Sequence, residues 1–461
     1  MVFSSTVFLF LFFPGLLILY YLNKNRLWRN SVLLLFSFIF YAWGEPLFVF
    51  ILVFYVLINW RLVLLLDKAT RNKKKLLILI VSVDVFLLVV FKYGYFLAEN
   101  LFALFKCNIE IYRMHLPIGI SFFTFQLMSY VFDVYYKKAE PQKNPFYLAL
   151  YISLFPQLIA GPIVRYQHIE SEITLREENN NDKIYGMKRF VYGLSKKVLL
   201  ANYLAQIADN AFDFFPEQIP SVMFVWYGAI SYSLQIYFDF SGYSDMAIGL
   251  GRMFGFHFLE NFNYPYISSS ISDFWRRWHI SLGTWFRDYV YIPLGGNQVN
   301  KTKWIRNLFI VWLLTGIWHG ANWTFMIWGL YYFFFILFEK NTGLDKKHCI
   351  LSHIWTLLIV VIGWVFFRSN NIIEGWKYVA AMFGNRTSGF IGYDFLEAFE
   401  GTYLVFGFAI IGATPLVCKV FSILDLKKHD WVESIWLIFI FMLSILAVVS
   451  STYNPFIYFN F

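Results

Sequence analysis

The histidine in the stretch LLTGIWHGANW (residues 313–323) is the side chain in this sequence best suited to chemistry. Between Asn307 and Phe338 the chain carries no Lys, Arg, Asp or Glu, so His319 stands among apolar residues. Ionisable groups inside a membrane span are rare and usually face the protein interior or a wet cavity. A neutral imidazole can accept the proton of a hydroxyl that attacks an acyl carbon, and desolvation favours the neutral form. The alternative is a structural histidine, hydrogen-bonded to a hydroxyl or a carbonyl.

The immediate neighbours of His319 fit a narrow, packed position. Gly316 and Gly320 are small enough for a helix or a thin acyl chain to approach closely. Trp318 is expected to line the same place, as a structural residue. Asn322 could orient the imidazole or hydrogen-bond an acyl oxygen, although asparagine is equally ordinary at a helix break.

The most polar stretch attached to the apolar core is residues 261–297. Its charged and titratable side chains alternate with tryptophans. They are Asp273, Arg276, Arg277, His279, Arg287 and Asp288, with Trp275, Trp278 and Trp285. On a helix Asp273 would face Arg276 and Arg277, and guanidinium groups match phosphate oxygens. The stretch is therefore either a substrate site or an interfacial helix with snorkelling arginines.

Two acids, Asp239 and Asp245, lie in the apolar segment YFDFSGYSDMAIG (residues 237–249). We expect them to line the tunnel region, pairing with Arg276, Arg277 or Arg287 or stabilising a tight break. A proton or cation path is the functional alternative.

Other motifs give little support for another chemistry. The glycines of residues 249–255 lack the dinucleotide-binding spacing, and no G-x-S-x-G occurs. The segment HCILSH (residues 348–353) has three possible ligands but no second pair, so we expect no metal site. Cys107, Cys349 and Cys418 are far apart and indicate no disulfide framework.

Composition indicates which elements must position these residues. Only 15% of the 461 residues are charged, whereas soluble domains carry about a quarter, and a membrane span needs roughly 20 apolar residues. The sequence predicts an all-α polytopic membrane protein. Apolar runs occupy residues 3–22, 31–44, 46–66, 76–97, 221–240, 304–320, 322–339, 353–368, 401–418 and 434–451. Residues 116–136, 146–163 and 186–205 are broken by Pro, Gly or charges, and they are further spans, re-entrant segments or interfacial helices.

We attribute the net charge of +9 to basic residues that set the orientation of the membrane spans. We expect no nucleic-acid partner. Short basic loops at residues 23–30, 67–75, 137–145, 339–348 and 424–430 are expected to be cytoplasmic. The acidic loop 209–220 is expected to face outward. Counting from these anchors places the N-terminus outside, residues 241–303 inside and residues 369–400 outside.

Several stretches together carry a family resemblance. They are MVFSSTVFLFLFFPG, FYAWGEP, LPIGISFFTFQ, FPQLIAGPIVR, YFDFSGYSDMAIGL, residues 261–297 and GIWHGANWTFMIWGLY. In order and spacing the chain resembles bacterial members of the membrane-bound O-acyltransferase (MBOAT) family, especially the membrane subunits that O-acetylate alginate, other exopolysaccharides or peptidoglycan. The relative that D-alanylates teichoic acids shares the histidine layout and is less similar.

The resemblance implies a fold and a site. It implies a single domain over residues 1–461, with a core at about 115–340. It also implies a ring of about ten to twelve transmembrane helices, plus re-entrant or interfacial helices, around a central funnel. In that family two histidines are the functional positions, which correspond to His319 as the catalytic base and His279 as its support.

The expected activity is O-acyl transfer, most simply acetylation of a cell-surface polysaccharide by a protein of the bacterial cytoplasmic membrane. The donor would be acetyl-CoA or another acyl thioester, with no bound cofactor. Expected partners are membrane lipids, an esterase-like (SGNH-type) extracytoplasmic acyltransferase, and the polysaccharide, with an acyl-carrier protein or a small accessory peptide as further candidates. The alternatives are D-alanyl transfer to teichoic acids and a polysaccharide or ion transporter with a His/Asp relay.

Overall fold

The computed structural model describes residues 1–106, 109, 112–214, 218–423, 430–451 and 453–457. Within these ranges every regular element is a helix. The chain divides into two compact units, Met1–Phe190 with Ser244–Leu259, and Val191–Tyr243 with Glu260–Phe461. The long helix α12 (Val222–Met253) contributes to both units. The all-α prediction is therefore confirmed.

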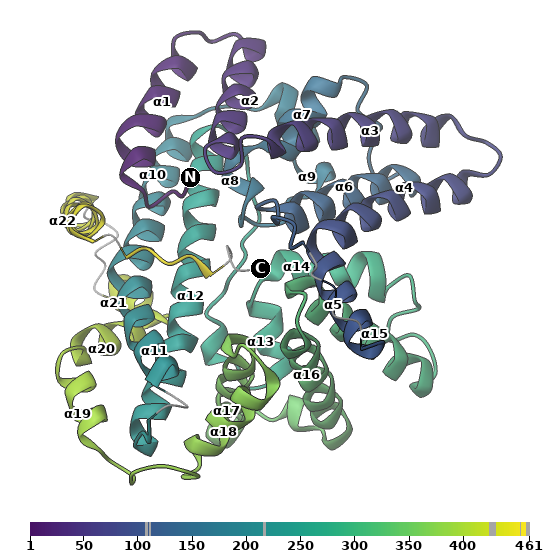
Figure 1. The fold of residues 1–461 in the computed structure, drawn as a ribbon. Helices are drawn as coiled ribbons and strands as arrows, with labels where there is room; N and C mark the ends of the chain where they lie inside the picture. The colour runs from purple at the N-terminus through teal and green to yellow at the C-terminus, as the bar shows by residue number, and fades with distance from the viewer. Residues whose placement is uncertain (107–108, 110–111, 215–217, 424–429, 452, 458–461) are drawn as a thin grey trace. The chain divides into compact units, whose positions relative to one another are not determined.

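The first unit contains the end of α12 and the helices up to Phe190 (Figure 1). They are α1 (Phe13–Tyr21), α2 (Arg26–Ala42), α3 (Phe48–Lys68), α4 (Lys73–Leu88), α5 (Gly94–Leu104), α6 (Ile120–Tyr135), α7 (Pro145–Ser153), α8 (Phe155–Leu158), α9 (Tyr166–Leu175) and most of α10 (Asn180–Ser195). Helices α3 and α4 lie side by side, and α6 packs against both. The side chains of α6 are mostly buried because other helices surround it.

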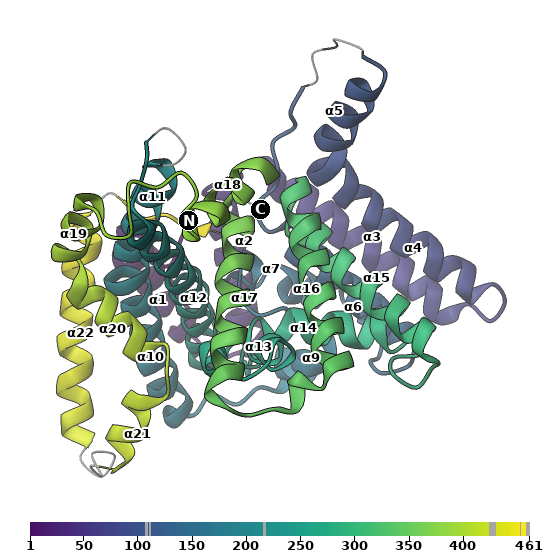
Figure 2. The ribbon, with the colours of Figure 1, turned by 90° about the horizontal axis from the view of Figure 1, so that it is seen from below.

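The second unit holds the candidate site. Besides much of α12 it comprises α11 (Asn202–Phe214), α13 (Ile271–Arg277), α14 (Ile280–Phe286), α15 (Lys301–His319), α16 (Trp323–Thr342), α17 (Ile350–Arg368), α18 (Ile372–Met382), α19 (Tyr393–Glu400), α20 (Tyr403–Gly412), α21 (Leu416–Ile423) and α22 (Asp430–Ser450). Helix α16 packs between α15 and α17 (Figure 2). The core of the second unit is a cluster of buried aromatic and aliphatic side chains, mainly from α11, α12, α13, α15, α16 and α17, which Ala409 of α20 and Ile457 also join.

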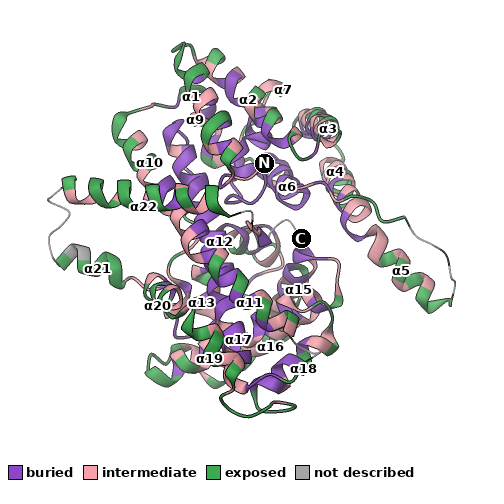
Figure 3. Cartoon of the chain, turned by 60° about the vertical axis from the view of Figure 1, so that its left-hand side comes forward, coloured by how far each residue is buried: buried purple, intermediate pink, exposed green. Residues whose placement is uncertain are grey.

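Four helices are long and apolar enough to cross a membrane by length and composition, or five if the bent pair Tyr393–Glu400 and Tyr403–Gly412 forms one span, counting only described residues. The four are residues 48–68, 73–104, 350–368 and 431–450. Most of helix α22 is exposed or partly exposed (Figure 3), and its exposed residues are mainly apolar. Helices also occupy the other predicted runs, but they are shorter or more polar.

One predicted run is wrong as a single helix. Residues 401–418 are divided between α20 and α21, and a turn separates these helices at Ala413–Pro415. The residue before a proline is disfavoured in helical geometry, so Pro415 ends one helix and begins the next. The broken stretch 146–163 is likewise interrupted, at Leu154, between α7 and α8. The predicted basic loop 424–430 lies almost wholly outside the described residues, as does Cys107.

Candidate active site

His319 is the last residue of α15, and two glycines set its surroundings. A Cβ on Gly316 would lie 2.4 Å from the backbone oxygen of Phe325, so α15 and α16 cross at backbone contact. A Cβ on Gly320 would lie 2.2 Å from the Phe325 ring. At both glycines the adjoining space is taken up by Phe325 of α16, and the tunnel role expected for Gly316 and Gly320 stays a prediction.

The imidazole of His319 is 4% exposed and is enclosed by aromatic rings. Its ring centroid lies 5.0 Å from that of Trp318, 5.0 Å from Trp328 and 5.2 Å from Phe367, all in edge-to-face geometry. Trp328 is fully buried, and its indole Nε1 has no hydrogen-bond partner among the described residues. An N–H donor therefore lies beside His319, and the part of the chain that the structure describes offers it no hydrogen-bond acceptor.

His279 lies at the junction of α13 and α14, in the left-handed conformation with φ of 46°. It is 2% exposed. Its ring packs edge-on against Phe240 of α12 with centroids 4.6 Å apart, and against Trp318 at 5.9 Å. The structure thus brings His279 and His319 to the same tryptophan, Trp318, from two different elements.

The hydrogen bonds of His279 define its tautomer. Nδ1 lies 3.2 Å from Oδ1 of Asn261, and the same oxygen accepts from the backbone N–H and the hydroxyl of Ser281. Since an amide oxygen only accepts, Nδ1 carries the hydrogen and the lone pair of a neutral ring is on Nε2. Nε2 has no hydrogen-bond partner among the described residues. Burial lowers the pKa of His279 to about 3, so the ring is neutral at physiological pH.

The arginines of α13 pair locally, as their spacing predicts. Asp273 forms ion pairs with Arg276 at 3.2 Å and with Arg277 at 2.9 Å. Arg287 pairs with Asp288 at 2.6 Å. Side-chain exposure is 75% for Arg276 and 58% for Arg287, which leaves both able to reach a soluble ligand.

Residues 261–297 do not form one continuous helix, and the interfacial placement considered for them stays a prediction. Its two seven-residue α-helices, α13 and α14, are separated at Trp278–His279, and a 3-10 turn at Pro265–Ile267 and a π-helical turn at Arg287–Tyr291 lie on either side of them. Trp278 and Trp285 are 2% and 3% exposed, and Trp275 packs against Trp328 inside the aromatic cluster. Trp275 and Trp278 belong to the core because α13 packs against α16 and α17. Trp285, on α14, is buried against Phe286 and Tyr289 instead.

The predicted partners of Asp239 and Asp245 are wrong. Asp239 forms a buried ion pair with Lys197 at 2.6 Å, and Asp245 pairs with Arg189 at 2.6 Å. The arginines of the 261–297 stretch are instead neutralised by the acids Asp273 and Asp288, which are nearest to them in sequence. Asp239 still lies next to the site, since its neighbour Phe240 contacts His279.

Asn322 caps a helix, in contrast to the ring-orienting role considered for it. Its Oδ1 accepts from the backbone N–H of Thr324, and its Nδ2 donates to the carbonyl of Asn370. Asn322 also lines a pocket with Trp323 and residues 371–374 and 377, at the end of α15 that carries His319. Asn322 therefore belongs to the wall of an open pocket.

The segment 348–353 holds its histidines in hydrogen bonds. His348 Nδ1 lies 2.7 Å from the hydroxyl of Ser269, and His353 Nδ1 lies 3.0 Å from the carbonyl of Ser268. Within the described ranges no cluster of three or more His, Cys, Asp or Glu residues has the geometry of a metal site.

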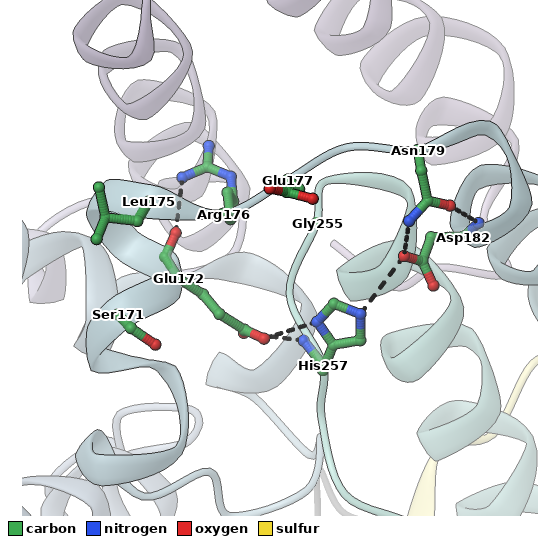
Figure 4. Close-up of a pocket in the computed structure, with 9 residues that line it drawn as sticks. All are labelled: Ser171, Glu172, Leu175, Arg176, Glu177, Asn179, Asp182, Gly255 and His257. Atoms are coloured by element: carbon green, nitrogen blue, oxygen red, sulfur yellow. Dashed lines mark hydrogen bonds and ion pairs between the residues drawn. The ribbon is translucent and has the colours of Figure 1, made fainter.

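A pocket in the first unit uses residues that the sequence did not single out (Figure 4). The ring of His257 lies between two carboxylates, with Glu172 Oε1 2.6 Å from Nδ1 and Asp182 Oδ2 3.5 Å from Nε2. Burial alone would raise the pKa of Asp182, but hydrogen bonds from Arg252 and Asn179 outweigh it and lower that pKa. These residues are far apart in sequence, so no local motif could have revealed the cluster.

The structure thus has two buried histidines that contact one tryptophan inside an apolar helical protein. Comparison with known proteins adds a family to this description. The model of the membrane-bound O-acyltransferase family matches residues 33–368. The chain is 44% identical over 393 residues to a probable alginate O-acetylase of Pseudomonas aeruginosa, which covers 83% of this chain and 75% of that protein. A probable alginate O-acetylase of Pseudomonas putida is 39% identical over the whole of both chains. A peptidoglycan O-acetyltransferase of Helicobacter pylori is 33% identical over 100% of this chain and 98% of its own.

The fold and the matches define the class, a multi-pass integral membrane acyltransferase. The chain belongs to the membrane-bound O-acyltransferase family. The family and activity predicted from the sequence are confirmed, whereas the roles of individual site residues stay predictions.

Proposed function

We propose that this protein transfers an acetyl group from a cytoplasmic thioester, acetyl-CoA, to a hydroxyl on the outer side of the bacterial cytoplasmic membrane, for O-acetylation of a cell-surface polysaccharide. Relatives named alginate O-acetylase and peptidoglycan O-acetyltransferase support the acyl group and the acceptor class. The observation that carries the proposal is the convergence of His279 and His319 on Trp318 inside a buried aromatic cluster.

In this mechanism His319 is the general base. Its imidazole takes the proton of the acceptor hydroxyl while the oxygen attacks the thioester carbon. When the tetrahedral intermediate collapses, the carbon–sulfur bond breaks and the proton passes from His319 to the departing thiolate. The products are an acetyl ester and a free thiol.

His279 and Trp328 complete the site with complementary hydrogen-bonding groups. With its lone pair on Nε2, His279 accepts a hydrogen bond from a donor other than the attacking hydroxyl, whose single hydrogen goes to His319. A neighbouring hydroxyl of the acceptor would suit it, and this bond would orient the acceptor. A neutral ring in this tautomer cannot donate from Nε2 to an oxyanion. The indole N–H of Trp328, beside His319, is suited to that role, because donors aimed at developing negative charge are worth about 10² to 10³ in kcat.

The donor's phosphates would bind at the exposed arginines Arg276, Arg277 and Arg287. Each already faces an aspartate, so a phosphate must compete with Asp273 or Asp288 for the guanidinium. Carboxylate and phosphate both pair bidentately with arginine, so the advantage of a dianionic phosphate over a single carboxylate would be its greater charge. An acyl-carrier protein is the alternative source of the thioester.

The architecture proposed for this reaction is a ring of about ten to twelve transmembrane helices around a funnel. The N-terminus and residues 369–400 are outside, and residues 241–303 are on the cytoplasmic side, as basic loops favour. The pocket of Asn322 and Trp323, at the end of α15 where His319 lies, then serves as the acceptor's opening. An SGNH-type partner or a small accessory peptide would dock there and carry the acetyl group to the polymer.

Reconstitution tests this function. Purified protein in proteoliposomes receives acetyl-CoA with a radiolabelled acetyl group, and we expect thiol release coupled to label on a hydroxyl acceptor. Mass spectrometry of surface polysaccharide from cells with and without the protein identifies the polymer. Solute movement without thioester consumption would instead establish the transporter with a His/Asp relay. Transfer of D-alanine in place of acetate would establish the teichoic-acid activity.

A further inference from the structure

The C-terminal segment Tyr453–Ile457, here called the strap, crosses the second unit and is held by buried polar side chains. Phe456 and Ile457 are 6% and 8% exposed. Because the strap is not part of a sheet or a long helix, its backbone groups need partners from elsewhere. Side chains of α11, α12 and the π-helical turn Lys196–Ala201 supply them.

The buried ion pair Lys197–Asp239 binds the end of the strap. Lys197 Nζ donates to the carbonyl of Pro455 and lies over the ring of Phe456 at 5.7 Å. Asp239 Oδ2 accepts from the backbone N–H of Ile457 at 2.9 Å. The pair itself is 2.6 Å long, and both side chains are at most 3% exposed.

A second ion pair binds the start of the strap. Asp209 accepts a hydrogen bond from the Tyr453 hydroxyl and pairs with Arg368 at 2.7 Å. Asn202 Nδ2 lies 3.4 Å from both the carbonyl of Tyr453 and the Oδ1 of Asn454. The strap therefore joins two ion pairs that are distant in sequence.

Each ion pair is next in sequence to a contact of a site histidine. In both cases one member of the pair directly precedes or follows an aromatic residue that packs on an imidazole. Asp239 precedes Phe240, whose ring packs on His279 at 4.6 Å. Arg368 follows Phe367, whose ring packs on His319 at 5.2 Å. The strap thus ties together the helices α12 and α17, which support the two imidazoles.

We propose that the strap is part of the active-site frame, and that Lys197 and Asp239 are positioning residues that hold it and thereby fix the relative placement of His279 and His319. This inference rests on the proposed function, since its main readout is acyl transfer. It gives Asp239 a role other than that of a proton relay.

The variants Lys197→Met and Asp239→Asn test the proposal in proteoliposomes. A misplacement of about 1 Å at a reacting centre can cost about 100-fold in rate, so we expect kcat to fall roughly 10- to 100-fold with the donor KM unchanged. The double variant Lys197→Met with Asp239→Leu removes both charges and avoids an unpaired buried charge if a single variant fails to fold. Asp345→Asn is the matched control. It removes the Lys340–Asp345 ion pair, which does not contact the strap, and should keep wild-type activity.

A disulfide rescue separates positioning from chemistry. Asn202→Cys and Asn454→Cys are introduced with Cys107, Cys349 and Cys418 replaced by Ser, in the Lys197→Met and Asp239→Asn backgrounds. The reference is the same cysteine variant with Lys197 and Asp239 intact, in its oxidised form. Oxidation of the Lys197→Met and Asp239→Asn proteins should return kcat to within about threefold of this reference, and reduction should lower kcat again. Loss of activity that the disulfide does not repair would overturn the proposal, as would wild-type kcat in both single variants. An inactive wild-type protein in the same vesicles would instead count against the proposed function.

Discussion

Trp318 packs on the imidazole of His279 with ring centroids 5.9 Å apart, and Trp318 is itself the residue before His319. One indole therefore contacts a histidine from the α13–α14 junction and the histidine that ends α15. This contact makes the relative placement of the two imidazoles sensitive to the size of a single side chain.

Truncating Trp318 should remove the contact that aligns the imidazoles of His279 and His319. We expect Trp318→Ala to lower kcat about 100-fold through loss of alignment, whereas Trp318→Phe, which keeps an aromatic ring, should stay within about tenfold of wild type. Initial rates of acetyl transfer measure the effect, and thermal unfolding in detergent checks that both variants fold. A Trp318→Ala protein with wild-type kcat would show that this contact is irrelevant to the reaction.

Asn261 fixes the tautomer of His279, so its removal should release the ring. Asn261→Leu leaves the buried N–H of Ser281 without its acceptor, which costs about 1–3 kcal/mol of stability, and we expect kcat to fall by roughly tenfold or more. Ser281→Ala is the control, because it keeps the bond between Asn261 and His279 and should leave kcat near wild type. Equal rates in the two variants would argue against tautomer control.

The low pKa of His279 predicts a pH dependence of stability. The folded-state pKa of about 3 lies below the ordinary value of about 6.5, so the unfolded chain binds the proton more readily between these values. The stability that this group contributes is complete above pH 6.5 and declines as the pH falls toward 3, by up to about 1.4 kcal/mol per pH unit.

Melting temperatures of wild type and His279→Gln, measured from pH 7 down to about pH 5, check this expectation. The glutamine side chain does not titrate, so the variant should lose less stability than wild type as the pH falls. Parallel curves would mean that His279 binds a proton as readily in the folded protein as in the unfolded chain, which would contradict the lowered pKa.

The pairing of Asp273 with two arginines predicts opposite effects on the donor. Arg276→Ala combined with Arg277→Ala should raise the KM for acetyl-CoA with a smaller change in kcat, because a binding contact is lost. Asp273→Asn frees both guanidinium groups and should lower that KM. Saturation curves at fixed ionic strength measure both, and an unchanged KM in all variants would leave these residues as structural ion pairs.

Hydropathy predicted where the helices lie. The predicted runs 322–339 and 353–368 correspond to α16 and α17, and Gly316 lies where the backbones of α15 and α16 come close. These features depend on composition and local spacing, which a single sequence contains. The run 401–418 was wrong because hydropathy averages over the break that Pro415 imposes.

The site was only partly predictable. The local ion pairs of Asp273 follow from helical spacing, but the partner of Asp239 is Lys197, on an element that no spacing rule connects to it. The left-handed backbone of His279 and the burial of Trp278 also depend on tertiary packing. His319 stood out from its apolar context, and the family resemblance added His279, with the roles of both as predictions. The contact of Trp318 with His279 and the free lone pair on Nε2 required the structure.

The central claim is that the unprotonated imidazole of His319 takes the acceptor's proton, and replacing that ring tests it most directly. His319→Ala and His319→Gln are reconstituted beside wild type, and thiol release coupled to acetyl transfer is measured at saturating donor. Loss of a general base costs about 10² to 10⁴ in rate, so both variants should fall by that amount while remaining folded and inserted. Transfer by folded His319→Ala at the wild-type rate would contradict the account.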